Sequence, residues 1–221
     1  MYAKDLISDV IPSLKTSDTG QTALNWMELF RISHLPIVNN KEFLGLISDS
    51  DIYDQNIAEE AIGNHKLALF NPHILENQHI YEVIETISRL KLTALPVLDA
   101  NKDYRGIISL PDLLHNFSQI TALEHPGGII VLELNENDYY LSQITQIIEG
   151  NDARILSLYV TSKPNSTKME VTIKVNISNI SGIIQTFERY DYTVKETFRE
   201  KNLANDILQN RYDSLMNFLN I

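Results

Sequence analysis

The 221-residue sequence contains no cysteine. This absence excludes disulfide bridges, thiol catalysis, iron–sulfur clusters and cysteine-ligated zinc, and it is typical of a reducing cytoplasm. Basic side chains are also scarce, because 18 Lys plus Arg stand against 29 Asp plus Glu, for a formal net charge of −11. Residues 1–120 carry 9 basic and 16 acidic side chains, and residues 121–221 carry 9 and 13. Neither half is basic, so we expect no nucleic-acid partner and no anionic membrane partner.

Long hydrophobic runs are missing as well. The uncharged apolar stretches are only a few residues long, and the N-terminus, MYAKDLISDVIPSLK, has acids where a signal peptide needs a cationic start. With 43% hydrophobic and 21% charged residues, the chain can still bury a core. We therefore expect a cytoplasmic protein of one or two domains.

Motifs of catalysis and metal binding are absent too. The six histidines form no His-x₃-His pair and have no carboxylate at metal-ligand spacing. The sequence also has no Gly-x-Gly-x-x-Gly, no P-loop and no Gly-x-Ser-x-Gly motif. These absences predict no metal site, no required cofactor and no enzymatic activity.

The first half contains an internal repeat. Residues 34–38 (HLPIV) correspond to residues 94–98 (ALPVL), and residues 45–52 (GLISDSDI) correspond to residues 106–113 (GIISLPDL). Each unit predicts a β-α-β-β-α order whose last helix begins at Ser-x-x-Asp. The two units should share a core, because each alone has too little apolar surface.

The x-Leu-Pro-apolar strand and the Gly-apolar-apolar-Ser-x-x-Asp motif, repeated in register, resemble a tandem pair of CBS domains, or Bateman module. The resemblance covers about residues 1–120, with repeats at about 1–60 and 61–120. It implies an α+β fold in which the two repeats pack as a pair.

The second half predicts a different domain. Residues 119–128, QITALEHPGG, indicate a boundary, and residues 126–221 predict a ferredoxin-like β-α-β-β-α-β order with a C-terminal helix at 203–221. We expect that last helix to pack on its own domain; the alternative is that it contacts a partner protein or a second copy of the chain in a dimer. The domain resembles an ACT domain, a fold that often senses amino acids, although Asn137-Asp138-Tyr139-Tyr140 stands where such sites usually have Asp-x-x-Gly. The whole arrangement resembles the bacterial acetoin-utilisation B-type CBS proteins.

The resemblance implies a ligand site in each repeat. In nucleotide-binding CBS pairs, the aspartates matching Asp51 and Asp112 accept hydrogen bonds from ribose hydroxyls, and the residues matching Ser48 and Ser109 contact ribose or phosphate. A carboxylate suits a ribose diol because it only accepts hydrogen bonds, and a helix start presents free N–H groups to a phosphate. The alternative is that Ser-x-x-Asp only caps each helix.

Three further residues are candidates for the same sites. His34 precedes Leu-Pro at a position where CBS pairs often hold a basic side chain against phosphate, which predicts stronger binding at mildly acid pH; a structural role is the alternative. Val10 and Phe70 are sixty residues apart and could line adenine pockets, or belong to the core.

The leading hypothesis is a regulatory protein that binds an adenine nucleotide or related adenosyl ligand, such as AMP, ADP, ATP or S-adenosylmethionine, in the cleft between the repeats. The alternative is a dimerisation or protein-interaction module that binds no ligand. We expect a homodimer, and a partner protein that the sequence does not identify.

Overall fold

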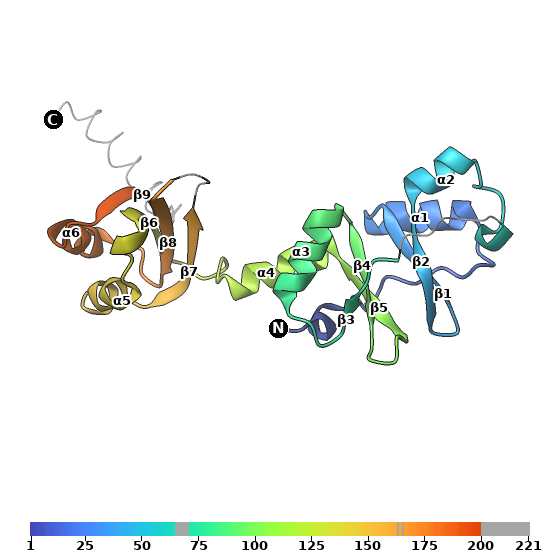
Figure 1. Ribbon diagram of the computed structural model, residues 1–221, viewed down its shortest axis with the longest axis horizontal. Coiled ribbons are helices and arrows are strands. Elements are labelled where there is room, and N and C mark those ends of the chain that lie inside the picture. Colours follow the sequence, from blue (N-terminus) through green and yellow to red (C-terminus); the bar gives the residue numbers. More distant parts are fainter. Residues whose placement is uncertain (65–70, 163, 165, 200–221) are drawn as a thin grey trace, which may run out of the picture. The chain divides into compact units, whose positions relative to one another are not determined.

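The computed structural model describes residues 1–64, 71–162, 164 and 166–199 (Figure 1). The chain divides into two compact units, Met1–Phe117 and Ser118–Ile221, and each is described here by itself. The boundary falls within helix α4, close to the composition change at residues 119–128.

The first unit contains the two repeats. The elements of the first repeat are η1 (Ala3–Leu6), α1 (Gly20–Phe30), β1 (His34–Asn39), β2 (Glu42–Ser48) and α2 (Asp49–Gln55). Those of the second are η2 (Ile62–Asn64), β3 (Ile74–Leu75), α3 (Ile80–Leu90), β4 (Ala94–Leu98), β5 (Tyr104–Ser109) and α4 (Leu110–Ile120). The helix–strand–turn–strand–helix order predicted from the repeat is therefore present twice.

The strand expected before the first helix differs between the repeats. In the second repeat it is β3, which pairs in parallel with β4 in a sheet of order β3-β4-β5. In the first repeat it shrinks to one parallel bridge, Leu14 with Ile37, beside the antiparallel pair β1-β2. Pro12 stands two residues before this bridge and has no N–H to extend the ladder.

Each repeat contributes buried side chains to the hydrophobic core of the other. Leu46 of β2 lies in the hydrophobic cluster of the second repeat, with Leu95 and Ile108. Its repeat counterpart, Ile107 of β5, lies in the cluster of the first repeat, together with Ala94. Each core is thus completed by the other repeat, as the shortage of apolar surface in a single unit predicts.

The N-terminal segment also crosses to the second repeat. Ala3 and Leu6 of η1 lie in the second repeat's cluster, and Ala3 N–H donates to the carbonyl of Gln78 at 2.9 Å. The segment then passes over β5, where Ser8 N–H donates to the carbonyl of Ile107 at 2.9 Å. Gly106 makes room for this crossing, because it has φ +155° and a Cβ added there would lie 2.4 Å from Cγ2 of Ile7.

The second unit has the β-α-β-β-α-β order predicted from the sequence, and its elements differ from the expected ranges only at their ends. They are β6 (Gly128–Asn135), η3 (Glu136–Asp138), α5 (Leu141–Glu149), β7 (Ile155–Ser162), β8 (Lys168–Val175), α6 (Ser181–Arg189) and β9 (Thr193–Arg199). All three strand pairs are antiparallel, in the order β7-β8-β6-β9. Both helices pack against one face of this sheet around Phe187, which is fully buried. The helix predicted at 203–221 lies outside the described residues.

The crossing at Gly106 generates a prediction for stability. Gly106→Ala should lower the free energy of unfolding by about 1–3 kcal/mol, because the added methyl group overlaps Ile7 in a packed interior. Denaturant unfolding of the single variants Gly106→Ala and Ile7→Ala and of the double variant measures the coupling. In the Ile7→Ala background the cost of Gly106→Ala should fall; an unchanged cost would show that Ile7 is not the obstacle.

Candidate ligand-binding site

The first Ser-x-x-Asp motif lies where β2 ends and α2 begins. Ser48 is the N-cap, and its Oγ accepts from Asp51 N–H at 3.1 Å and donates to Asp51 Oδ2 at 2.7 Å. Ser48 N–H also donates to Asp51 Oδ2, at 2.8 Å, which completes a capping box. The carboxylate of Asp51 accepts both of its hydrogen bonds from Ser48 at Oδ2. Within the described part of the chain, Oδ1 of this exposed carboxylate accepts no hydrogen bond.

The second motif repeats the side-chain pair at the β5–α4 junction. Ser109 Oγ donates to Asp112 Oδ2 at 2.7 Å and accepts from Asp112 N–H at 3.2 Å. Ser109 is 2% exposed and Asp112 is half-buried, so this pair is more enclosed than the first. The two motifs therefore have the same local geometry in different degrees of burial.

His34 of β1 lies next to the first motif because β1 pairs with β2. It lies opposite Ser48 in the β1–β2 register, and its Nδ1 lies 2.9 Å from Oγ1 of Thr93, just before β4 of the other repeat. Thr93 N–H also points at Nδ1, at 3.4 Å, while Ser33 N–H donates to Thr93 Oγ1 at 2.8 Å. These donors assign Nδ1 as an acceptor, which leaves the ring proton on Nε2.

Thr93 was not among the residues expected at the site. The signal for it was present in the repeat, because Thr93 is the counterpart of Ser33 and directly precedes Ala94, the counterpart of His34. The hydrogen bonds of Ser33 and His34 to Thr93 show that equivalent positions of the two repeats meet here. Residues of both repeats thus meet beside the first Ser-x-x-Asp motif.

The electrostatics of His34 favour its neutral form. Burial lowers the pKa of its imidazole, while the nearby carboxylates of Asp49 and Asp51 act in the opposite direction without outweighing burial. Hydrogen bonds between His34 and Thr93 join the two repeats here. The contact of His34 with a phosphate stays a prediction.

Val10 and Phe70 are the two remaining predicted residues. Val10 lies in the segment between η1 and Leu14 with 71% of its side chain exposed, so it is not a core residue. Phe70 lies outside the described residues. A groove of about 630 Å³ runs beside the first motif; its lining includes Ser33, Asp49 and Tyr53.

The described residues contain no group of three or more His, Asp or Glu side chains that could hold a metal ion. In the same part of the chain, no helix has the length and apolar character needed to cross a membrane.

The second unit has a cavity of about 350 Å³ at the turn between β6 and α5. Tyr140, which replaces the glycine of the expected ligand turn, has φ −116°, so this backbone does not require glycine. Tyr140 and Asp138 line the cavity together with Tyr192, whose hydroxyl donates to Gln143 Oε1 at 2.8 Å. Burial raises the pKa of Tyr192, and the charge of Asp138 adds to this. The cavity is acidic and aromatic, and the described residues that line it include no cationic side chain.

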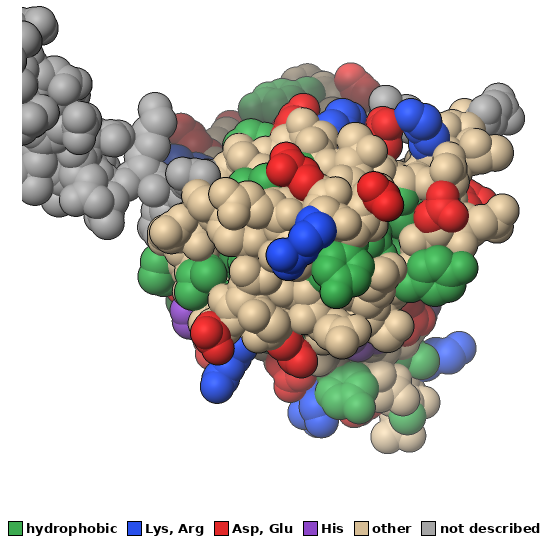
Figure 2. Space-filling view, turned by 90° about the vertical axis from the view of Figure 1, so that its left-hand side faces the viewer, with side chains coloured by type: hydrophobic (Ala, Val, Ile, Leu, Met, Phe, Trp, Pro, Cys, Tyr) green, Lys and Arg blue, Asp and Glu red, His purple; other side chains and the backbone are tan. Residues whose placement is uncertain are grey.

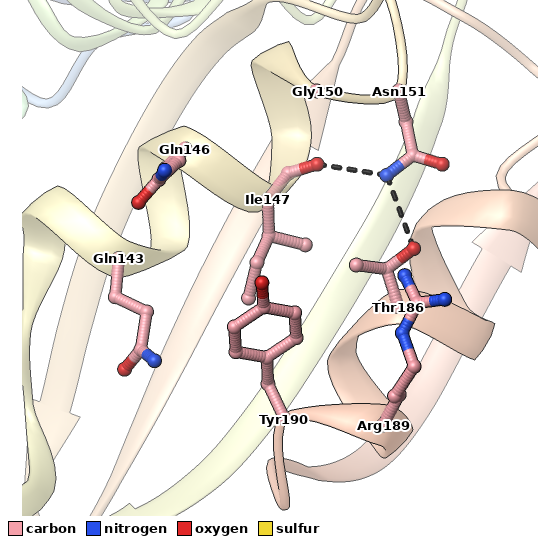
Figure 3. Close-up of a pocket in the computed structure, with 8 residues that line it drawn as sticks. All are labelled: Gln143, Gln146, Ile147, Gly150, Asn151, Thr186, Arg189 and Tyr190. Atoms are coloured by element: carbon pink, nitrogen blue, oxygen red, sulfur yellow. Dashed lines mark hydrogen bonds between the residues drawn. The ribbon is translucent and has the colours of Figure 1, made fainter.

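A second cavity of about 330 Å³ lies between α5 and α6 (Figure 3). Asn151 links the two helices, because its Nδ2 donates to the carbonyl of Ile147 at 2.8 Å and to Oγ1 of Thr186 at 3.2 Å. Arg189 and Tyr190 project along the same groove. Of the six predicted site residues that the structure describes, none lines either cavity.

The lowered pKa of His34 predicts how stability depends on pH. The unfolded chain binds this proton near pH 6.5, whereas the folded chain binds it at lower pH. The stabilisation is therefore fully present above about pH 6.5 and is lost as the pH falls toward the folded-state pKa. Denaturant unfolding between pH 7.5 and 5 should show a smaller loss of stability in His34→Gln than in the unmodified chain. Equal losses would contradict the lowered pKa.

The comparison with protein families agrees with the repeat. The family model of the CBS domain matches residues 3–55 and 71–119. Similar solved structures include a CBS domain pair/ACT domain protein from Thermotoga maritima (21% identity, 54% of this chain and 98% of that chain, TM-score 0.47). They also include a putative acetoin utilization protein from Vibrio cholerae (23%, 56% and 95%, TM-score 0.48) and CBSX2 in complex with AMP (16%, 54% and 97%, TM-score 0.46). The two matched segments are the two repeats of the first unit, so this chain carries a tandem pair of CBS domains.

Proposed function

We propose that this chain is a regulatory, non-catalytic protein whose CBS pair binds an adenine nucleotide or related adenosyl ligand between its repeats. The observation that carries the proposal is the Ser–Asp pair at the end of β2 and again at the end of β5. Beside the first motif, His34 of the first repeat is hydrogen-bonded to Thr93 of the second repeat, and Thr93 also accepts from Ser33 N–H.

The free carboxylate oxygen is the feature best suited to the ligand. Asp51 uses Oδ2 for the helix cap, and Oδ1 remains available to accept from the hydroxyls of a ribose. Asp49 and Asp51 lie close to a His34 that favours its neutral form, so the local charge opposes a phosphate. The net charge of −11 acts in the same direction. AMP or S-adenosylmethionine therefore fits the first site better than ADP or ATP does.

The second unit is the proposed responder. Its strand order and its position after a CBS pair support an ACT-like domain, although the Tyr140 turn and the acidic cavity do not favour an amino acid ligand. Occupancy of the CBS site would change how this domain is presented to a partner in the cytoplasm, provided that the ligand binds one state more tightly than the other.

A second candidate function is a dimerisation or protein-interaction module. The capping box at Ser48 favours it, because helix capping alone accounts for the hydrogen bonds of both residues. Apolar side chains on three helices of the first unit are strongly exposed: Leu29, Tyr53 and Tyr81 are 71%, 66% and 66% exposed. Such side chains would suit a homodimer interface.

A thermal-shift series with AMP, ADP, ATP and S-adenosylmethionine tests ligand binding. A ligand at about one hundred times its dissociation constant should stabilise the chain by about 2.7 kcal/mol. The absence of a shift with all four would remove the nucleotide proposal and leave the interaction module.

Substitution of the two aspartates distinguishes ligand binding from helix capping. Asp51→Asn and Asp112→Asn keep an oxygen acceptor for each cap, yet they remove the charge that a ribose diol prefers. Each should weaken binding at its own site by about 1.5–3 kcal/mol, as loss of a charge-assisted hydrogen bond does. Asp54→Asn, an exposed carboxylate on the same helix α2, is the matched control. Unchanged affinity in both test variants would leave capping as the only role of these residues.

A further inference from the structure

Within the described residues, the helices of the second unit cover only one face of its sheet. Figure 2 views the unit from the side on which α5 and α6 lie, and there acidic and basic side chains are interspersed and hydrophobic side chains form separate patches. On β6, residues 130, 132 and 134 belong to the cluster under these helices. Because side chains alternate along a strand, Ile129, Val131 and Glu133 project from the opposite face, here called the open face.

The centre of the open face is apolar. Phe198 of β9 lies opposite Ile129. Tyr159 of β7 lies in the same row as Val131, with Thr172 of β8 between them. Phe198 and Tyr159 are 53% and 55% exposed. Ile129, Val131, Tyr159 and Phe198 form the open-face patch, and an apolar group of this kind on a sheet is a surface for a further layer of structure.

One carboxylate beside this patch has no salt bridge. Lys168 Nζ donates to Glu133 Oε1, and Lys195 Nζ donates to Glu170 Oε1 at 2.6 Å. Glu196 of β9 lies opposite Val131 and is exposed. Within the part of the chain that the structure describes, Glu196 forms no salt bridge, since the neighbouring Lys195 is bonded to Glu170. The open-face patch therefore combines an apolar surface with one negative charge beside it.

The segment after β9 has the complementary pattern in its sequence. Residues 203–221 predict a helix whose apolar residues are three and four positions apart and share one side. These residues include Leu203, Ala204, Ile207, Leu208, Leu215, Phe218 and Leu219. Arg211 is the one charged residue on that side, four positions after Ile207 and four before Leu215. The segment therefore offers an apolar stripe with a single positive charge within it.

This segment begins beside the open-face patch. Strand β9 ends at Arg199, which lies opposite Gly128 and directly follows Phe198. Residues 200–202 span at most about 10 Å, which is enough to carry the chain from this edge strand over the open face. The stripe and the patch are thus held close together by the chain itself.

The dimensions of the two surfaces also match. A helix of residues 203–221 is about 28 Å long, and the eight-residue strand β6 is about 27 Å long. Arg211 lies about 12 Å along such a helix. Glu196 lies about 10 Å back along β9 from its last residue. A helix that turns back over the sheet therefore brings the two opposite charges to the same level.

We propose that residues 203–221 form a helix that packs on the open face of the same copy of the chain, with its apolar side on the open-face patch and Arg211 next to Glu196. A tether of three residues gives the segment a high effective concentration at this face, so it competes well with any separate molecule. A partner protein then reaches the open face only by displacing this segment. The packing is independent of a ligand in the CBS pair.

The absence of cysteine makes the test direct, because Thr172→Cys introduces the sole thiol of the chain, in the middle of the open face. In the full-length chain, Leu215→Lys places a charge on the apolar side of the segment. It should speed the reaction of the Thr172→Cys thiol with a maleimide by about tenfold or more, because this reaction requires the segment to leave the sheet.

Two matched controls accompany this measurement. Asn217→Lys introduces the same side chain on the polar side of the segment, and it should leave the Thr172→Cys rate unchanged. Gln185→Cys places the thiol at an exposed position of α6, on the helix-covered side, and its rate should be the same with and without Leu215→Lys. An equal effect of Leu215→Lys and Asn217→Lys on the Thr172→Cys rate would overturn the proposal.

Charge reversal tests the predicted position of the helix. Arg211→Glu should speed the reaction of the Thr172→Cys thiol, because it places two carboxylates side by side. Adding Glu196→Arg should restore the slow rate, since opposite charges meet again. A double reversal that reacts as fast as Arg211→Glu alone would overturn the pairing of these two residues.

The dependence on protein concentration identifies the occupant of the open face. Packing within one copy should give the same Thr172→Cys rate at every protein concentration. A rate that rises on dilution would assign the face to a second copy and contradict the proposal. A slow rate that Leu215→Lys does not change would assign the face to another part of the chain, and it would also contradict the proposal.

Discussion

In the first unit, each repeat places apolar side chains in the hydrophobic core of the other repeat, and the fold of the unit depends on this packing. Leu46 of the first repeat lies in the second repeat's core, and Ile107 and Ala94 of the second lie in the first repeat's core. Removing a buried Leu or Ile side chain from such a cluster costs about 2–5 kcal/mol, so neither core is complete without the other. The hydrogen bonds of Thr93 to Ser33 and His34 lie in the same region of contact. The candidate site is therefore a product of the packing between the repeats.

The two Ser-x-x-Asp motifs differ in their surroundings although their sequences match. The Ser48–Asp51 pair closes a full capping box and stays exposed, whereas Ser109 is almost completely buried beside Asp112. His34 has Ala94 as its repeat counterpart, so this position carries an imidazole in the first repeat but not in the second. Duplication supplied two copies of one local geometry, and the substitutions around it gave each copy a different charge and accessibility.

The sequence predicted what short-range patterns determine. The Gly-apolar-apolar-Ser-x-x-Asp motif indicated both strand–helix junctions, and the alternation of residues 169–175 indicated β8. The first strand of the first repeat was overestimated, because hydrophobicity alone does not show how far a ladder extends past Pro12. The role of Thr93 and the lowered pKa of His34 were missed, because both arise from contacts between residues about sixty positions apart. Burial at such a contact outweighs the charges that local sequence reveals.

The crossing of the N-terminal segment over β5 has a consequence for the order of folding. Met1 and Ala3 make backbone hydrogen bonds with Ile80 and Gln78, and Ser8 makes one with Ile107. This segment thus acquires these partners only after residues 78–107 have been made. Contacts so distant in sequence form slowly, because the loop-closure entropy precedes their gain. During synthesis the core of the first repeat therefore stays incomplete until β4 and β5 have been made, because Ala94 and Ile107 belong to it.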